Sequence, residues 1–370
     1  MNDGRPSTGE PAEGEIVPKV RPWRADARGA ALPGFPGPVV FAARAVPCPV
    51  RAFAVRYRYE LALLATVAIW GINVPVLKFA LRELAPGHAN ALRFTLGALT
   101  LGLVGWVERR RRGVTLREAI RGHEWTLVGL GLFGYFFYQE AFIFGISRTS
   151  AASAALLTST APLWTAAIGH ATGIDRLRRS ALPGMALALG GAVVVALART
   201  GSGIDTLTGN LTILASSVFW ALFTVRQARL AGKVPPATGA SVSILVALVG
   251  LYAVAFLTTP TALDLGALSG ATIAALVFSG TLSVGLTFAV WNAAVAHVGP
   301  TTTASFGYLT PLFAAATAFV LLGEPITRWH LAGAALLISG LVWMRRGKAR
   351  VARQAREAEA LAALSVNGSA

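Results

Sequence analysis

Residues 155–193, ALLTSTAPLWTAAIGHATGIDRLRRSALPGMALALGGAV, have a counterpart 149 residues further along the chain, at 304–342, and the two stretches align without a gap. Matches of Ala and Leu are common in an apolar chain, so the rarer matches of Pro and Gly carry the alignment. The matched positions are Pro162-Leu163 with Pro311-Leu312, Ala166-Ala167 with Ala315-Ala316, Gly184 with Gly333, Ala186-Leu187 with Ala335-Leu336, Gly191 with Gly340, and the acidic Asp175 with Glu324.

The similarity extends to the start of each half. There a shift of 150 places Leu64-Ala65 on Leu214-Ala215 and Trp70 on Trp220. We therefore assign one copy of an internal repeat to residues 59–199 and a second copy to residues 207–345.

Both copies consist of long apolar runs. The chain is 54% hydrophobic and 14% charged, whereas soluble domains average about 25% charged residues. Helical runs of about 20 residues cross the roughly 30 Å hydrocarbon core of a membrane. The sequence predicts ten such spans, at 60–80, 88–106, 125–146, 150–171, 181–198, 209–230, 238–258, 271–292, 299–322 and 328–344.

The basic residues lie in blocks between the apolar runs. If the N-terminus is cytosolic, the inside segments hold 21 Lys and Arg without the distal tail, and the outside half holds six. This bias satisfies the positive-inside rule with an even number of spans, and it predicts a multi-pass protein of the inner membrane with both termini in the cytoplasm. Because the blocks separate membrane spans, the net charge of +16 does not indicate nucleic-acid binding.

Two polar tails flank the repeats. Residues 1–58 are rich in Pro, Gly, Ala and Arg, which predicts a disordered basic cytosolic tail; translation from a misplaced start codon is the alternative for residues 1–55. Residues 346–370 are predicted to be a charged cytosolic tail, either a solvated anchor or a helix. Cys48 is the one cysteine, which excludes a disulfide framework and a Cys-based zinc site.

The number of spans in one repeat decides how the copies insert. Five is odd, so the second copy must insert upside down relative to the first. Inverted repeats of this kind are a common plan of secondary transporters, in which two halves exchange conformations around a site near the membrane midplane. The predicted fold is thus an all-α membrane protein of ten transmembrane helices, arranged as two inverted five-helix repeats.

Two stretches resemble one known family. They are GISRTSAASAALLTSTAPLWTAA at 145–167 and AVAHVGPTTTASFGYLTPLFAAATAFVLLGEPIT at 294–327, together with Trp70-Gly71 and Leu92-Arg93-Phe94. They resemble the EamA-like branch of the drug/metabolite transporter superfamily over about residues 60–344. The resemblance implies ten spans, a central cavity, and export or exchange of amino acids and other small metabolites.

An intramembrane carboxylate is the sharpest candidate for function. Glu140 lies inside the third predicted span, and an ionised carboxylate there is costly unless it is paired or lines water. Desolvation favours its protonated form, so it could carry a coupling proton. Arg93 and Lys78 lie at a similar depth. We hypothesise that one of them neutralises Glu140; a structural ion pair, or snorkelling of Arg93, is the alternative.

Polar and aromatic residues at mid-span depth supply the mixture expected of a small-ligand pocket. Interhelical hydrogen bonding or lipid packing is the alternative for each of them. Two intrahelical prolines, Pro162 and Pro311, are candidate hinges or static kinks. The candidate substrate-binding or coupling residues are Trp70, Asn73, Arg93, Tyr138, Gln139, Glu140, Thr158, Trp220, Trp291, Asn292, Tyr308 and Thr310.

Several kinds of chemistry have no motif here. We find no Walker loop, no metal spacing among the five histidines and no nucleophile elbow, so we expect no cofactor, no metal and no enzyme activity. The expected partners are a small-molecule metabolite, membrane lipid and coupling protons. The sequence predicts a secondary transporter working by alternating access; an integral membrane enzyme and a non-transporting membrane partner are the alternatives.

Overall fold

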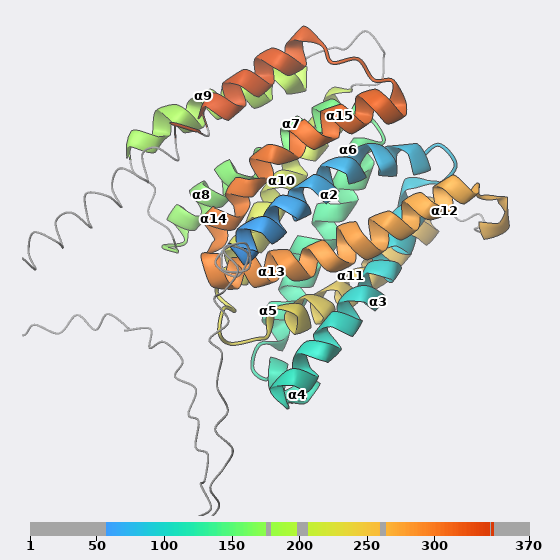
Figure 1. The fold of residues 1–370 in the computed structure, drawn as a ribbon, viewed down its shortest axis with the longest axis vertical. Coiled ribbons are helices and arrows are strands. Elements are labelled where there is room, and N and C mark those ends of the chain that lie inside the picture. Colours follow the sequence, from blue (N-terminus) through green and yellow to red (C-terminus); the bar gives the residue numbers. More distant parts are fainter. Residues whose placement is uncertain (1–56, 175–178, 198–205, 260–263, 341, 344–370) are drawn as a thin grey trace, which may run out of the picture. The chain divides into compact units, whose positions relative to one another are not determined.

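Helices form from the apolar runs, and no strand occurs in the part of the chain that the structure describes (Figure 1). This computed structural model describes residues 57–174, 179–197, 206–259, 264–340 and 342–343. They belong to one compact unit, Pro49–Ala370. The predicted N-terminal tail up to residue 56 and the predicted C-terminal tail lie outside the described residues.

The first repeat comprises α2 to α9. Its elements are α2 (Arg58–Ala80), α3 (Pro86–Arg112), the short α4 (Leu116–Ile120), α5 (Glu124–Leu130), the π-helix η1 (Gly131–Phe137), α6 (Tyr138–Ile146), α7 (Ala151–Thr158), α8 (Ala161–Ala171), the 3₁₀ turn η2 (Arg179–Ala181) and α9 (Leu182–Leu197).

The second repeat follows the same order. Its elements are α10 (Leu207–Ala228), α11 (Pro236–Thr258), the 3₁₀ turn η3 (Leu265–Ala267), α12 (Gly270–Val277), the π-helix η4 (Phe278–Leu286), α13 (Thr287–Val298), α14 (Pro300–Ser305), the 3₁₀ segment η5 (Phe306–Leu309), α15 (Thr310–Leu322) and a helix over 328–340.

Eight helical stretches in the described residues are long and apolar enough to cross a membrane. Two shorter helices, α9 with 16 residues and the helix over 328–340, lie where the fifth and tenth spans are predicted. The eight stretches are 58–80, 86–112, 124–146, 151–171, 207–228, 236–258, 270–298 and 300–322.

Two of the long helices extend beyond their predicted ends. The helix predicted to stop at residue 106 continues to Arg112, because Arg and Glu are good helix formers and four arginines favour a helix C-terminus; Gly113 ends it with φ +65°. The helix predicted to stop at residue 292 continues to Val298, because the apolar run lasts until Gly299-Pro300. Asn292 therefore lies inside a helix, not at its end.

The third and fourth spans of each repeat are irregular at equivalent places. The third span contains η1 and its counterpart contains η4, both of them π-helical. The fourth span breaks between α7 and α8, and its counterpart breaks at η5. Pro162 and Pro311 each lie in the first turn of the helix after the break, where the missing N–H of proline is tolerated. Irregular segments of this kind often mark functional sites.

The second spans of the two repeats pack through small residues. A Cβ on Gly105 would lie 3.1 Å from the carbonyl oxygen of Ala237, and a Cβ on Gly87 would lie 2.9 Å from Cα of Ala255. The shift of 150 maps each of these two contacts onto the other, since residue 87 corresponds to residue 237 and residue 105 to residue 255. They also require α3 and α11 to run antiparallel.

The fifth and tenth predicted spans make a contact of the same kind, and Figure 1 shows their helices side by side. A Cβ on Gly191 would lie 2.7 Å from the carbonyl oxygen of Gly333, and one on Gly340 would lie 2.3 Å from that of Gly184. Under the shift of 149 each contact maps onto the other. The two helices are again antiparallel, and their close approach depends on the absence of side chains.

Candidate functional site

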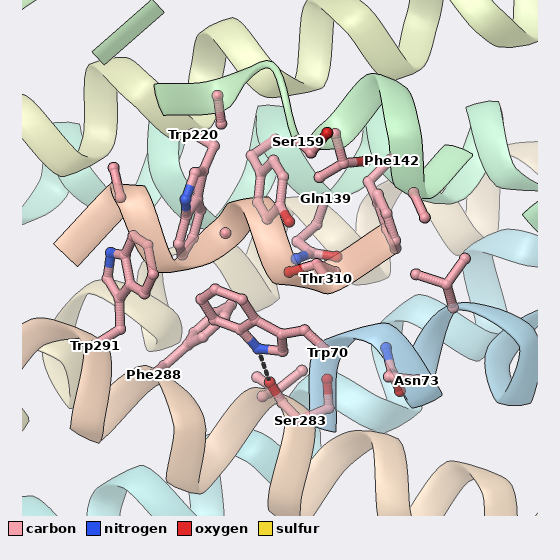
Figure 2. Close-up of a pocket in the computed structure, with 18 of the residues that line it drawn as sticks. Trp70, Asn73, Gln139, Phe142, Ser159, Trp220, Ser283, Phe288, Trp291 and Thr310 are labelled. Atoms are coloured by element: carbon pink, nitrogen blue, oxygen red, sulfur yellow. Dashed lines mark hydrogen bonds between the residues drawn. The ribbon is translucent and has the colours of Figure 1, made fainter. Parts of the chain in front are cut away.

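A cavity of about 60 Å³ lies between the two repeats (Figure 2). It has room for a compact ligand or a handful of water molecules. Its wall combines α2, α3, α6, α7 and α8 of the first repeat with α10, η4, α13, α14, η5 and α15 of the second. The lining residues are Trp70, Asn73, Val74, Arg93, Tyr138, Gln139, Phe142, Ala155, Thr158, Ser159, Ala161, Pro162, Trp220, Ser283, Val284, Phe288, Trp291, Ala304, Gly307 and Thr310.

Aromatic rings form one side of the cavity. Trp70 meets Trp220 edge to face, with ring centroids 5.4 Å apart, and Trp291 lies 4.9 Å from Trp70 and 5.3 Å from Trp220. Tyr138 contacts Trp220 at 4.9 Å, and Phe288 contacts Trp70 at 6.2 Å. These last two contacts map onto each other under the shift of 150, so the aromatic wall lies where the two repeats meet.

Trp70 is held in place by the π-helix of the second repeat. Its Nε1 donates to the carbonyl oxygen of Ser283 at 3.0 Å, as Figure 2 shows, and to Oγ1 of Thr287 at 2.8 Å. A buried indole N–H normally requires such a partner. The π-helix η4 thus orients one indole ring of the wall.

Arg93 provides a buried positive charge, and its side chain is 1% exposed. Its Nε donates to Oδ1 of Asn90 at 3.1 Å, and Nη1 donates to Oγ of Ser279 at 3.3 Å. Nη2 donates to Oε1 of Gln139. Within the described residues Arg93 forms no ion pair with a carboxylate. Three of the five N–H groups of a guanidinium are used, and all three acceptors are neutral.

Glu140 does not line the cavity. Its Oε1 accepts a hydrogen bond from Nδ2 of Asn90 at 2.8 Å, and the other end of that amide accepts from Arg93. Asn90 therefore bridges the carboxylate and the guanidinium, where the sequence suggested direct neutralisation. The amide is short enough to fit between two groups that lie on different helices.

Two atoms in the cavity wall carry unused hydrogen-bonding capacity. Oδ1 of Asn73 and Nε1 of Trp291 are buried and have no hydrogen-bond partner among the described residues. Figure 2 shows Asn73 and Phe142 on the side opposite to Trp220 and Trp291, with Trp70 between them. Because buried polar groups are nearly always satisfied, each such atom in a native structure requires an explanation.

Lys78 pairs with an acid other than Glu140. Its Nζ lies 2.8 Å from Oε1 of Glu324 and donates to the carbonyl oxygen of Thr149 at 2.6 Å. The second oxygen of Glu324 accepts from the backbone N–H of Ala151 at 2.8 Å. This ion pair, here called the Lys78–Glu324 latch, joins the C-terminal end of α2, the start of α7 and the segment after α15.

A second hollow lies on the other side of the latch. Its volume is about 280 Å³, and Lys78, Arg82 and Glu324 are among the residues that line it. Val74, four residues before Lys78, lines the central cavity. Four residues of helix span about 6 Å, so along α2 the latch separates the two spaces by about one turn.

Ten of the candidate residues from the sequence line the cavity, and four do not. Asn292 is buried beside it and donates through Nδ2 to the hydroxyl of Tyr135 and the carbonyl of Phe288. Tyr308 packs on a cluster around Leu163. Glu140 and Pro311 are also absent from the wall. The ten are Trp70, Asn73, Arg93, Tyr138, Gln139, Thr158, Pro162, Trp220, Trp291 and Thr310.

The sequence missed the apolar and small members of the wall, including Phe142, Ser283, Phe288 and Gly307. Such residues are common throughout membrane helices and carry little signal. Phe288 could have been found, because the shift of 150 maps Tyr138 onto it.

Similar proteins of known sequence cover most of the chain. A probable amino-acid metabolite efflux pump of Salmonella typhimurium is 29% identical over 288 residues, which are 75% of this chain and 91% of that protein. A probable terminal-alkyne amino-acid exporter of Streptantibioticus cattleyicolor is 26% identical over 292 residues, which are 77% of this chain and 92% of that protein.

The fold is also similar to a solved one. A crystal structure matches with a TM-score of 0.60 and 20% identity over 78% of this chain and 97% of the other. The model of the EamA-like transporter family matches twice, at residues 58–197 and 207–346. The protein is therefore a multi-pass membrane protein with two EamA repeats, and it belongs to the EamA-like transporter family.

Proposed function

We propose that this protein is a secondary transporter that exports or exchanges small metabolites, amino acids among them, by alternating access. The names of its relatives, an amino-acid metabolite efflux pump and an amino-acid exporter, support this substrate class. The observation that carries the proposal is the central cavity, whose wall is shared by both repeats.

The proposal includes two inverted five-helix repeats. The antiparallel contacts of Gly87 and Gly105 with α11 support it, as do those of Gly184 and Gly191 with the helix over 328–340. Equivalent helices that cross a membrane antiparallel have opposite insertion. Two halves related in this way can exchange conformations and so expose one site to each side in turn.

The Lys78–Glu324 latch is proposed as the closure on the outer side. The excess of Lys and Arg in the other loops supports an inner-membrane protein with both termini in the cytoplasm, and in that orientation the latch would lie at the outer ends of α2 and α15. Opening outward would break the ion pair and free the backbone groups of Thr149 and Ala151. Pro162 and Pro311, beside breaks in their spans, are the proposed hinges.

Glu140 is proposed as the proton-coupling group. It lies in a membrane span, and Asn90 links it to Arg93 of the cavity wall. A change in its protonation would alter the charge that balances Arg93, and so the affinity of the site for a charged solute.

Transport in proteoliposomes tests the proposal. The full-length protein would be reconstituted and loaded with a panel of labelled amino acids and other metabolites, with and without a pH gradient. We expect efflux or exchange of at least one member. Gly307→Phe should abolish it, because Gly307 lines the cavity and a Cβ there meets open space.

Gly190→Phe is the matched control. Gly190 is exposed on α9, and a Cβ there also meets nothing within 4 Å, so this variant should transport normally. Transport that survives Gly307→Phe would place the solute path elsewhere. Absence of transport for the whole panel would favour the membrane enzyme or the non-transporting partner.

A further inference from the structure

The two ends of the cavity wall differ in chemistry, and the difference matches a particular kind of solute. One part is the aromatic wall of Trp70, Trp220, Trp291 and Phe288. The other part holds the amide of Asn73 on the side of Phe142, and the guanidinium of Arg93 lies 6.0 Å from the ring of Phe142. Both of these polar side chains come from the first repeat, on α3 and α2.

Arg93 is prepared to bind an anion. Its guanidinium is fixed by Asn90, Ser279 and Gln139, and no described carboxylate pairs with it. Two of its five N–H groups remain for a ligand. Glu140 reaches Arg93 only through Asn90 and does not pair with it directly, so a direct partner would still stabilise the buried guanidinium. A carboxylate suits this role because it can accept from two N–H groups side by side.

Asn73 is prepared to accept a hydrogen bond. Its side chain is 5% exposed, and Oδ1 is buried with no partner among the described residues. An ammonium group brings three donors and no acceptor, so it would satisfy this oxygen. The cavity thus offers a cation on α3 and an acceptor on α2, two helices of one repeat that both pack against η4.

The remaining wall excludes a charged side chain. Val284 and Phe288 join the tryptophans there, and the polar residues elsewhere in the wall, such as Thr158, Ser159 and Thr310, are neutral. Because Arg93 is the one charged residue among the described residues of the wall, a second ionic group on the solute would lose its hydration without an ionic partner. The cavity volume of about 60 Å³ limits the solute to a compact molecule.

We infer that the cavity binds a zwitterionic α-amino acid with an uncharged, apolar side chain, whose carboxylate pairs with Arg93 and whose ammonium donates to Asn73. This inference rests on the proposed transport function and names the groups that select its solute. The aromatic wall then receives the side chain.

Matched ligands test each end of the solute separately. Binding of L-leucine, L-leucinamide and 4-methylpentanoate would be measured by calorimetry on the full-length protein in lipid nanodiscs. L-leucinamide lacks the carboxylate, and 4-methylpentanoate lacks the ammonium group. For a charge-assisted contact at each end we expect leucine to bind roughly tenfold to a hundredfold tighter than either analogue.

Two variants should each erase one of these differences. Arg93→Gln should reduce leucine binding to the level of leucinamide and leave leucinamide nearly unchanged. Asn73→Leu should reduce leucine binding to the level of 4-methylpentanoate. Arg148→Gln is the matched control, because Arg148 is an exposed arginine remote from the wall, and it should preserve both ratios.

The contrary outcomes separate this inference from the transport function. Equal binding of leucine and leucinamide to the wild type would overturn the inference, and this comparison needs no variant to fold. An unchanged leucine-to-leucinamide ratio in Arg93→Gln would do the same. If the protein exchanges other metabolites in proteoliposomes but does not bind leucine, transport stands and the inference fails. If leucine binds more tightly than both leucinamide and 4-methylpentanoate, as expected, but nothing is transported, the inferred site stands and the proposed transport function fails.

Discussion

Asn73, Asn90 and Arg93 of the first repeat correspond, at a shift of 150, to Phe223, Ala240 and Ser243 of the second. Gln139 and Glu140 correspond in the same way to Ala289 and Val290. The first repeat therefore carries the charged and amide side chains that line the cavity, Arg93, Asn73 and Gln139, and the second repeat has apolar or small residues at the same positions.

The packing positions behave differently. Gly184 and Gly191 have their counterparts Gly333 and Gly340, and both pairs make the same backbone approach. Trp70 and Trp220 also correspond and contact each other. A close contact between two related helices needs a small residue on both copies, whereas one solute in one cavity needs each polar group once. Packing can therefore keep the repeats alike while recognition makes them differ.

The largest expected effect comes from breaking the shared packing. In Gly191→Leu and Gly340→Leu, the Cβ would lie 2.6 Å from N of Leu337 and 2.3 Å from O of Gly184 respectively. Backbone atoms cannot move aside as a flexible side chain can, so we expect each variant to lose about 3 kcal/mol of stability or more. The measurement is the melting temperature in detergent.

We expect equal losses of stability in Gly191→Leu and Gly340→Leu, because the two contacts correspond under the repeat. Gly190→Leu is the control, because its Cβ meets nothing within 4 Å. A large loss in only one of the two glycine variants would show that the two contacts are not energetically equivalent.

The next largest effect concerns the latch, where the repeats differ in charge. The position of Lys78 corresponds to Ala228 at a shift of 150. The side chains of Lys78 and Glu324 are 15% and 12% exposed, so removal of one partner leaves a partly buried charge. We expect Lys78→Met and Glu324→Gln each to cost about 1–2 kcal/mol, and the double variant to cost less than their sum.

Cysteine labelling from the outer side would report the opening that this loss allows. Labelling of a cysteine at Val74 should become faster in either latch variant. Arg82→Met is the control, because Arg82 is exposed and forms no ion pair among the described residues. Additive losses in the double variant would show that the two charges do not act together.

Much of this comparison could be predicted from the sequence. The aligned Pro and Gly positions predicted which helices repeat, and Trp70 with Trp220 predicted two rings of the cavity wall. Arg93 was recognised because a charge inside a membrane span requires a reason. These signals are strong because each residue type is rare or costly at its position.

Partners were harder to predict than positions. Residue depth along a helix placed Lys78, Arg93 and Glu140 together, but depth does not say which way a side chain faces or which helix is its neighbour. The acid that pairs with Lys78 is Glu324, 246 residues away in sequence, and the bridge between Arg93 and Glu140 is Asn90, an uncharged residue. The π-helices η1 and η4 follow from tertiary packing and gave no periodic signal.

A smaller effect, on the dependence of transport on a pH gradient, is expected from removing the carboxylate of Glu140 in the first repeat. Glu140→Gln should remove the part of transport that depends on a pH gradient and leave exchange without a gradient nearly unchanged, since glutamine can still accept from Asn90. Val290→Ala, at the corresponding position of the second repeat, should keep the full pH dependence. Exchange in proteoliposomes with and without a pH gradient measures both. Full pH dependence in Glu140→Gln would assign proton coupling to another group.

The smallest effect is expected at the turns between the first and second spans of each repeat, where Glu83 corresponds to Lys233. Glu83 accepts from the backbone N–H and the hydroxyl of Ser269, the N-cap residue of α12, at 2.9 and 2.8 Å. These hydrogen bonds, the backbone one foremost, lower the pKa of Glu83 from its ordinary value of 4.5. A carboxyl group whose pKa is lower in the folded state than in the unfolded state stabilises the fold when the pH is above the unfolded-state pKa. That stabilisation is lost as the pH falls through the folded-state pKa.

Melting temperatures of the wild type and Glu83→Gln should therefore differ slightly at neutral pH and converge below pH 4.5. The difference stays small because Glu83 is exposed. Lys233→Gln, at the corresponding turn of the second repeat, is the matched control, and its difference from the wild type should not change with pH. A Glu83→Gln difference that persists in acid would mean that the turn is tied to α12 by shape and not by the charge of the carboxylate.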